Sequence, residues 1–114
     1  MNEPSKNPFR VLIVDDEPAI RDMFAELLRA PNRSVDVRDT PRAALEFLRH
    51  NPVDLAFVDY MLPGMTGTKL AAKIKEKCPR AHIVICTGHS VDISAQEAGA
   101  TSVERVLHKP VDLG

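Results

Sequence analysis

The chain has no excess of charge of either sign and no long apolar run. Its 114 residues carry 15 Lys and Arg against 16 Asp and Glu, and the sequence pI is near 6.4. Such a balance offers no basic field for nucleic acid and no polybasic face for a membrane surface. The apolar runs are too short to span a bilayer, and the polar start "MNEPSKNPF" has no signal-peptide core. We therefore expect a cytoplasmic protein that binds neither nucleic acid nor membrane directly.

Cysteine is also scarce. Cys78 and Cys86 stand eight residues apart and form no CxxC pattern, which argues against a disulfide framework or a zinc site. Cys86 lies within the apolar stretch "HIVIC", where we expect it to be a small buried residue.

The composition is that of an ordinary globular domain, 44% hydrophobic and 27% charged, and the length allows one modest core. Residues 1–8 contain two prolines and no periodicity, so they are expected to be a disordered lead-in to a single domain at 9–114.

Strand-like and helix-like segments alternate along this domain. Strands are predicted at 10–15, 34–39, 53–59, 81–87 and 103–109, helices at 17–30, 40–51 and 68–77, a loop at 60–67, and a short polar helix near 93–98. Because each helix has room to cross over the sheet, the pattern predicts a mostly parallel sheet with helices on both faces. The short alternating segment at 34–39 is expected at an edge.

Apolar residues at helical spacing predict which face of each helix is buried. Thr40 is expected to be the N-cap of the second helix, ahead of a proline. The residues expected to face the core are Ala19, Ile20, Met23, Phe24, Leu27 and Leu28 in the first helix, Ala44, Leu45 and Leu48 in the second, and Leu70 and Ile74 in the third.

Polar residues stand at the carboxyl ends of four predicted strands. Asp15 and Asp16 follow the first strand, Asp59 ends the third, Thr87 ends the fourth and Lys109 ends the fifth. In a parallel sheet these ends share one rim, which is where ligands bind. Carboxylates gathered there repel one another unless a cation offsets them. Lys109 supplies one positive charge, and a ligand set of oxygens alone favours Mg²⁺.

Each of these residues also has a plain structural reading. Asp16 and Glu17 could cap the N-terminus of a helix, Asp59 and Thr87 could be turn residues, and Lys109 could be an ordinary solvent-exposed lysine. Their convergence on one rim favours a site that handles a phosphoryl group, with Thr87 donating a hydrogen bond to it.

The chain resembles the receiver domain of two-component response regulators, the CheY-like family. The resemblance rests on "VLIVDDEP", "VDLAFVDYMLPGMTG", "IVICTGHS" and "VLHKP", which together span most of the chain. It implies a flavodoxin-like, doubly wound α/β fold with a five-stranded parallel sheet in the order 2-1-3-4-5.

The resemblance also implies the roles of the rim residues. Asp59 would accept the phosphoryl group, and Thr87 and Lys109 would contact its oxygens. Mg²⁺ would be held by Asp16, Asp59 and the backbone carbonyl of Met61, with Asp15 acting through a water molecule.

The implied activity is that of a switch with weak autophosphorylation and autodephosphorylation, rather than of a conventional enzyme. The donor would be a phosphohistidine on a sensor histidine kinase or a histidine phosphotransfer protein. The switch would control an output domain or a downstream protein. The resemblance is also compatible with a homodimer.

Two features depart from the family. The chain stops at "KPVDLG", where the last helix of the family begins, so the domain is expected to be truncated before that fifth helix. Val106 stands where the family usually has Tyr or Phe, three residues before the lysine.

Two other functions stay open. An aspartyl-phosphate phosphatase of the haloacid-dehalogenase type needs a second Asp two residues after the nucleophile, where this chain has Met61. A pseudo-receiver, an interaction module that no longer accepts phosphate, normally lacks an acidic or lysine position that this chain keeps.

Overall fold

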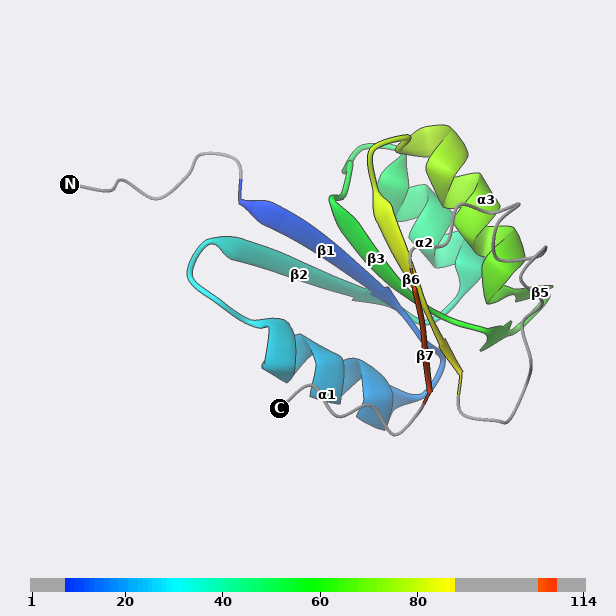
Figure 1. The fold of residues 1–114 in the computed structure, drawn as a ribbon, viewed down its shortest axis with the longest axis horizontal. Coiled ribbons are helices and arrows are strands. Elements are labelled where there is room, and N and C mark those ends of the chain that lie inside the picture. Colours follow the sequence, from blue (N-terminus) through cyan, green and yellow to red (C-terminus); the bar gives the residue numbers. More distant parts are fainter. Residues whose placement is uncertain (1–7, 88–104, 109–114) are drawn as a thin grey trace.

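The computed structural model describes residues 8–87 and 105–108, the latter by their backbone alone (Figure 1). The elements in chain order are β1 (Phe9–Val14), α1 (Pro18–Leu28), β2 (Arg33–Arg38), α2 (Pro41–Leu48), β3 (Leu55–Asp59), β4 (Met61–Leu62), β5 (Met65–Thr66), α3 (Gly67–Lys77), β6 (His82–Thr87) and β7 (Arg105–His108).

The main sheet is parallel and has the order β2-β1-β3-β6-β7. Since β6 and β7 are the fourth and fifth of its strands, this is the predicted 2-1-3-4-5 order, and β2 is the predicted edge strand. Val11 to Val14 of β1 are all buried, as expected of a strand with neighbours on both sides and helices on both faces.

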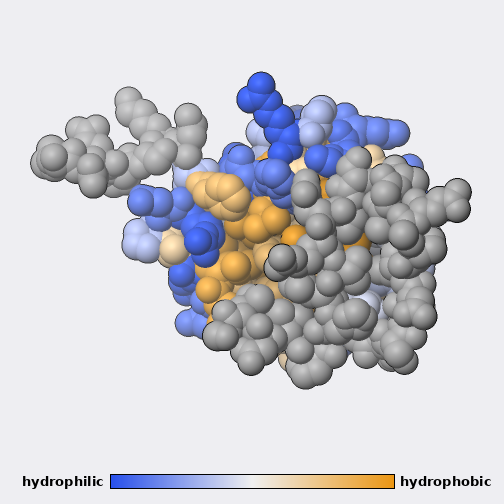
Figure 2. Space-filling model, viewed as in Figure 1, coloured by the Kyte–Doolittle hydropathy of each residue, from blue (hydrophilic) through white to orange (hydrophobic). Residues whose placement is uncertain are grey.

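Helices cover both faces of the sheet, with α1 on one and α2 and α3 on the other (Figure 1). The larger core cluster packs α2 and α3 on the sheet, and Leu48, Leu70 and Ile74 are its helix residues of largest size. The smaller cluster joins α1 to the opposite face through Phe24 and Phe57, whose ring centroids are 5.1 Å apart. Figure 2 shows apolar residues gathered near the centre of this face, with hydrophilic residues above them and to their left.

Helix α1 buries less of its apolar stripe than predicted. Phe24 is buried and Ile20, Met23 and Leu28 are partly buried, whereas Ala19 and Leu27 are exposed. The prediction was wrong for Ala19 and Leu27 because six apolar residues form a stripe wider than the strip of sheet that one helix can cover.

The segment at 60–67 is more ordered than the predicted loop. It contains β4 and β5, which form a small antiparallel hairpin with Leu62 opposite Met65. Pro63 and Gly64 form its two-residue turn, and Gly64 has a φ of 85°. A proline followed by a residue at positive φ is the pattern of a type II turn, which explains the glycine.

The predicted N-cap of α2 is confirmed. The Thr40 hydroxyl accepts a hydrogen bond from the backbone N–H of Ala43 at 3.1 Å, and Pro41 begins the helix. Ala44 and Leu48 are buried as predicted, and Leu45 is partly buried at the edge of that face. Cys86 is buried within β6, also as predicted.

Several predictions lie outside the described residues: most of the lead-in, the polar helix near 93–98, Lys109, and the side chain of Val106. No helix in the part of the chain that the structure describes has the length and apolar character needed to cross a membrane.

Candidate functional site

The register of the sheet sets the carboxylates side by side. Val14 of β1 is paired with Val58 of β3, so the next residues, Asp15 and Asp59, lie level at the carboxyl ends of adjacent strands. Asp59 is paired with Cys86 of β6, so Thr87 follows one step further along. The polar residues at the carboxyl ends of β1, β3 and β6 therefore lie close together at one edge of the sheet, as expected for parallel strands joined by crossover connections.

Four carboxylates meet at this point. One oxygen each from Asp15, Asp16, Glu17 and Asp59 can be chosen so that all lie within 4.8 Å of one another. Asp15 and Asp59 are only 2% and 5% exposed, whereas Asp16 and Glu17 are open to solvent. Ionised carboxylates this close together repel one another, and a bound cation would offset that repulsion.

Asp15 is held by the backbone around it. Its Oδ1 accepts a hydrogen bond from the N–H of Glu17 at 2.9 Å. Its carbonyl oxygen accepts one from Arg21 Nη1 at 2.9 Å, and its N–H donates to the carbonyl of Arg38 at 3.1 Å. The first turn of α1 is thereby tied to the end of β1, which fixes the direction of the Asp15 carboxylate.

Asp59 is placed by the hairpin that follows it. The N–H of Met61 donates to Asp59 Oδ1 at 3.4 Å, and the N–H of Tyr60 donates to the carbonyl of Cys86 at 2.7 Å. The chain then turns back, and the N–H of Gly67 donates to the carbonyl of Tyr60 at 2.6 Å.

Gly67 touches the backbone of the Asp59 segment. A Cβ at position 67 would collide with the Asp59 carbonyl oxygen and would lie 2.9 Å from the Tyr60 Cα. Real Cβ atoms do not approach backbone this closely, so helix α3 can begin against the end of β3 only with glycine at its first position.

The ligand set fits a hard divalent cation. All of its donors are oxygens, with no His or Cys among them. Two oxygens bound to one Mg²⁺ ion lie at most about 4.2 Å apart, since each bond is about 2.1 Å. Separations within 4.8 Å therefore need only small side-chain rotations to reach that geometry.

The structure brings the predicted residues Asp15, Asp16 and Asp59 into one cluster. Thr87 ends the strand beside Asp59 and is fully buried, and Met61 is exposed next to the cluster. Lys109 lies outside the described residues. The role assigned to each of these residues stays a prediction.

The sequence reasoning missed Glu17 as a candidate ligand. It was assigned only to the N-terminus of the first helix, and it is the N-cap residue, but its side chain makes no capping hydrogen bond. The signal that could have found it is the run of three acidic residues, "DDE", directly after a buried strand.

A family model for the response regulator receiver domain matches residues 11–114. The chain therefore belongs to the receiver domain family of response regulators, and its function is that of a phosphoacceptor domain in two-component signalling. Neither an aspartyl-phosphate phosphatase nor a pseudo-receiver is favoured by the comparisons.

Curated relatives agree with this family. The chain is 32% identical to the regulatory protein VanR of Enterococcus faecium, over 89% of this chain and 43% of VanR. It is 35% identical to the two-component response regulator ORR11 of Oryza sativa, over 91% of this chain and 73% of ORR11. The chain thus spans less than half of VanR.

Solved structures share the fold. A CheY-like receiver domain protein from Methanospirillum hungatei superposes with a TM-score of 0.84 at 28% identity, over 92% of this chain and 84% of that one. The response regulator TrrA from Thermotoga maritima, solved in complex with Mg²⁺–BeF, superposes with a TM-score of 0.76 at 29% identity, over 88% of this chain and 85% of TrrA.

Proposed function

We propose that Asp59 is the phosphoryl acceptor of this domain. The observation that carries the proposal is the position of its buried carboxylate, at the end of the central strand β3 and within 4.8 Å of oxygens of Asp15, Asp16 and Glu17. The sheet order supports it, because Asp59 is the carboxylate flanked by both β1 and β6.

The reaction is an in-line transfer from a phosphohistidine. An oxygen of Asp59 forms a bond to phosphorus as the bond between phosphorus and the imidazole nitrogen breaks, and the nitrogen keeps the electron pair. The product is an acyl phosphate on Asp59, which water later hydrolyses. The hydroxyl of Thr87 donates to a phosphoryl oxygen, and the ammonium of Lys109 offsets its charge.

Asp16, Asp59 and the carbonyl of Met61 would hold Mg²⁺ directly, and Asp15 would act through a water molecule. When bound, the ion neutralises negative charge on the carboxylates and the phosphoryl oxygens, so that one anion can approach another. The oxygen-only cluster supports this assignment, as does the Mg²⁺–BeF complex of the related TrrA.

The donor is a sensor histidine kinase or a histidine phosphotransfer protein, and the output is a further domain or a downstream protein, in the cytoplasm. The match covers only 43% of VanR, so in that protein the matching region is joined to a further segment of comparable length. This supports the proposal of an output domain. The receiver itself would be residues 9–114, with residues 1–8 as its lead-in.

Phosphorylation can be measured by intact mass after incubation with acetyl phosphate and Mg²⁺. The wild-type chain should gain one phosphoryl group, and Asp59→Asn should gain none, because an amide is not a nucleophile for this transfer. Asp22→Asn is the matched control, since Asp22 is exposed on α1 and is not one of the four clustered carboxylates, and it should behave as wild type.

An adduct on Asp59→Asn would overturn the assignment of the acceptor. If the wild-type chain gains no mass, either from acetyl phosphate or from a phosphorylated histidine donor, the domain is a pseudo-receiver.

A further inference from the structure

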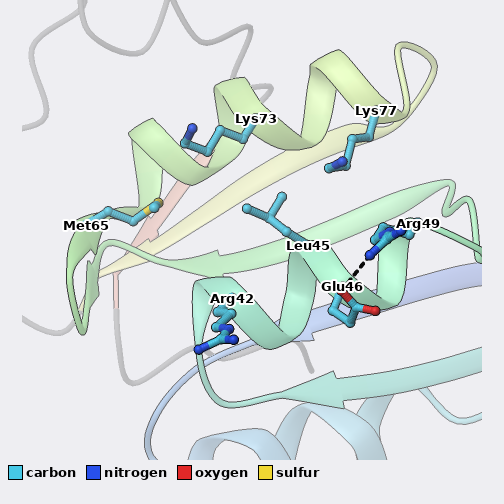
Figure 3. Close-up of a pocket in the computed structure, with 7 residues that line it drawn as sticks. All are labelled: Arg42, Leu45, Glu46, Arg49, Met65, Lys73 and Lys77. Carbon is cyan, nitrogen blue, oxygen red and sulfur yellow. Dashed lines mark hydrogen bonds and ion pairs between the residues drawn. The ribbon is translucent and has the colours of Figure 1, made fainter.

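A groove runs between α2 and α3, on the face of the domain that those helices cover (Figure 3). Its volume is about 440 Å³, which is within the range of sites that hold a small ligand or a few side chains. Its lining comes from α2 and the residue after it, from β5 and from α3: Arg42, Leu45, Glu46, Arg49, Met65, Lys73 and Lys77.

Four of the lining residues are cationic and one is anionic. Glu46 pairs with Arg49 at 3.4 Å, but both side chains are at least 60% exposed, so this pair is weak. Arg42, Lys73 and Lys77 form no ion pair with any residue that the structure describes. This face is therefore strongly basic although the whole chain carries a formal net charge of −1.

The charges surround an apolar floor. In Figure 3 the side chain of Leu45 lies between the two helices, with Arg42 and Lys73 toward one end of the groove and Arg49 and Lys77 toward the other. Met65 adds a second apolar side chain at the first of these ends. Both apolar residues are partly buried, so their exposed portions would gain from contact with an apolar partner.

The spacing of the cations suits an extended chain with several carboxylates better than one compact anion. Arg42 and Arg49 stand seven residues apart, or about 10 Å along a helical path. A single phosphate needs cations that converge on one point. Carboxylates four residues apart in an extended peptide point to the same side, about 13 Å apart, and the residue midway between them points to that side as well.

We propose that the groove between α2 and α3 binds an acidic peptide segment of a partner protein, with an apolar side chain of the segment packed on Leu45 and Met65. Carboxylates on either side of that residue meet Arg42 and Lys73 at one end and Arg49 and Lys77 at the other. This site lies apart from the carboxylate cluster at the strand ends, and it does not depend on phosphoryl transfer.

The test uses a fluorescent peptide of about eight residues, with glutamates four positions apart and a leucine midway between them, so that all three side chains point to one side of an extended chain. Fluorescence anisotropy in low salt should show saturable binding to the chain with a Kd below about 1 mM. Replacing the leucine of the peptide by serine, or its glutamates by glutamine, should each weaken binding several-fold. No saturable binding below that concentration overturns the proposal.

Two double variants test the location of the binding site. Arg42→Glu with Lys73→Glu reverses one cation on each helix and should weaken binding at least tenfold. Arg42 is in the first turn of α2, where an acidic residue favours the helix dipole, so this change should leave the fold intact, as circular dichroism can verify. Arg29→Glu with Lys69→Glu makes the same change of net charge at exposed sites outside the groove.

The control variant should bind the peptide within about twofold of wild type, apart from the small effect of net charge. Equal loss in both double variants would show that the attraction is general and would contradict the proposed site. The proposal also fails if a short RNA or anionic lipid vesicles bind through Arg42 and Lys73 while the peptide does not.

Discussion

At the scale of single residues, the two adjacent aspartates after β1 have different environments. Asp15 is buried and accepts the N–H of Glu17, whereas Asp16 is exposed and faces the same cluster. Both carboxylates reach the cluster, but one oxygen of Asp15 already accepts the N–H of Glu17, whereas Asp16 is open to solvent. This difference supports the proposal that Asp16 binds Mg²⁺ directly and that Asp15 acts through a water molecule.

We predict that Mg²⁺ affinity depends more on Asp16 than on Asp15. Asp16→Asn should weaken binding at least tenfold because it removes a direct anionic ligand, and Asp15→Asn should have a smaller effect. Isothermal titration of Mg²⁺ into each variant measures both, with Glu17→Gln included to test the residue that the sequence reasoning missed. Equal losses for Asp15 and Asp16 would show that their roles cannot be divided in this way.

Gly67 is the residue on which the position of Asp59 depends most directly. We predict that Gly67→Ala destabilises the domain by about 1–3 kcal/mol, because the new methyl group displaces the backbone of Asp59 and Tyr60. The same variant should be phosphorylated more slowly by acetyl phosphate. Urea unfolding and mass spectrometry measure the two effects.

Gly64→Ala is the control for this prediction. It strains a positive φ in the hairpin turn, but its Cβ would have no neighbour within 4 Å. Stability should fall by about 1 kcal/mol from the strain alone, with the rate of phosphorylation nearly unchanged. A rate that falls equally in both variants would show that the contact with Asp59 is not the cause.

At the scale of elements, α1 packs on the sheet through Phe24, which is fully buried, and through partly buried side chains around it. Phe24 is buried against Phe57, whereas Leu27, on the margin of the same stripe, is 51% exposed. The helix also carries Arg21, which bonds the carbonyl of Asp15, so its docking bears on the geometry of the carboxylate cluster.

We predict that Phe24→Ala lowers the free energy of unfolding by about 3–5 kcal/mol, because it removes a buried ring and leaves a cavity. Leu27→Ala should change it by less than about 0.5–1 kcal/mol, since little apolar surface is lost. Chemical denaturation of both variants provides the comparison. A large effect of Leu27→Ala would mean that this side chain is covered in solution.

At the scale of the whole molecule, charge is segregated by topology. The carboxylates collect at the ends of the parallel strands, and the cations of α2 and α3 collect on a helix face. A net charge of −1 describes neither region. A cation bound among these carboxylates would offset their negative charge.

We therefore predict that Mg²⁺ raises the stability of the folded domain. At ten times its Kd, an ion that binds only the folded state adds about 1.4 kcal/mol to the free energy of unfolding. Thermal unfolding with Mg²⁺, with EDTA, and with NaCl of equal ionic strength measures this gain. Asp16→Asn should lose most of it, and a gain of the same size in NaCl would show that general screening is responsible.

The sequence by itself determined the alternation of strands and helices, the buried strand at Val11 to Val14, the N-cap at Thr40 and the placing of Asp15, Asp59 and Thr87 at strand ends. These follow from local rules: periodicity, capping chemistry and the demand of parallel strands for crossovers. The sequence also predicted that these residues share one rim of the sheet, whereas the tertiary structure decided the exact contacts. The register of β1 on β3 set Asp15 level with Asp59, the close contact of Gly67 fixed the start of α3, and the width of the sheet left Leu27 exposed. It also turned the charges of two helices into one basic groove, because a groove depends on how helices pack, which no local pattern encodes.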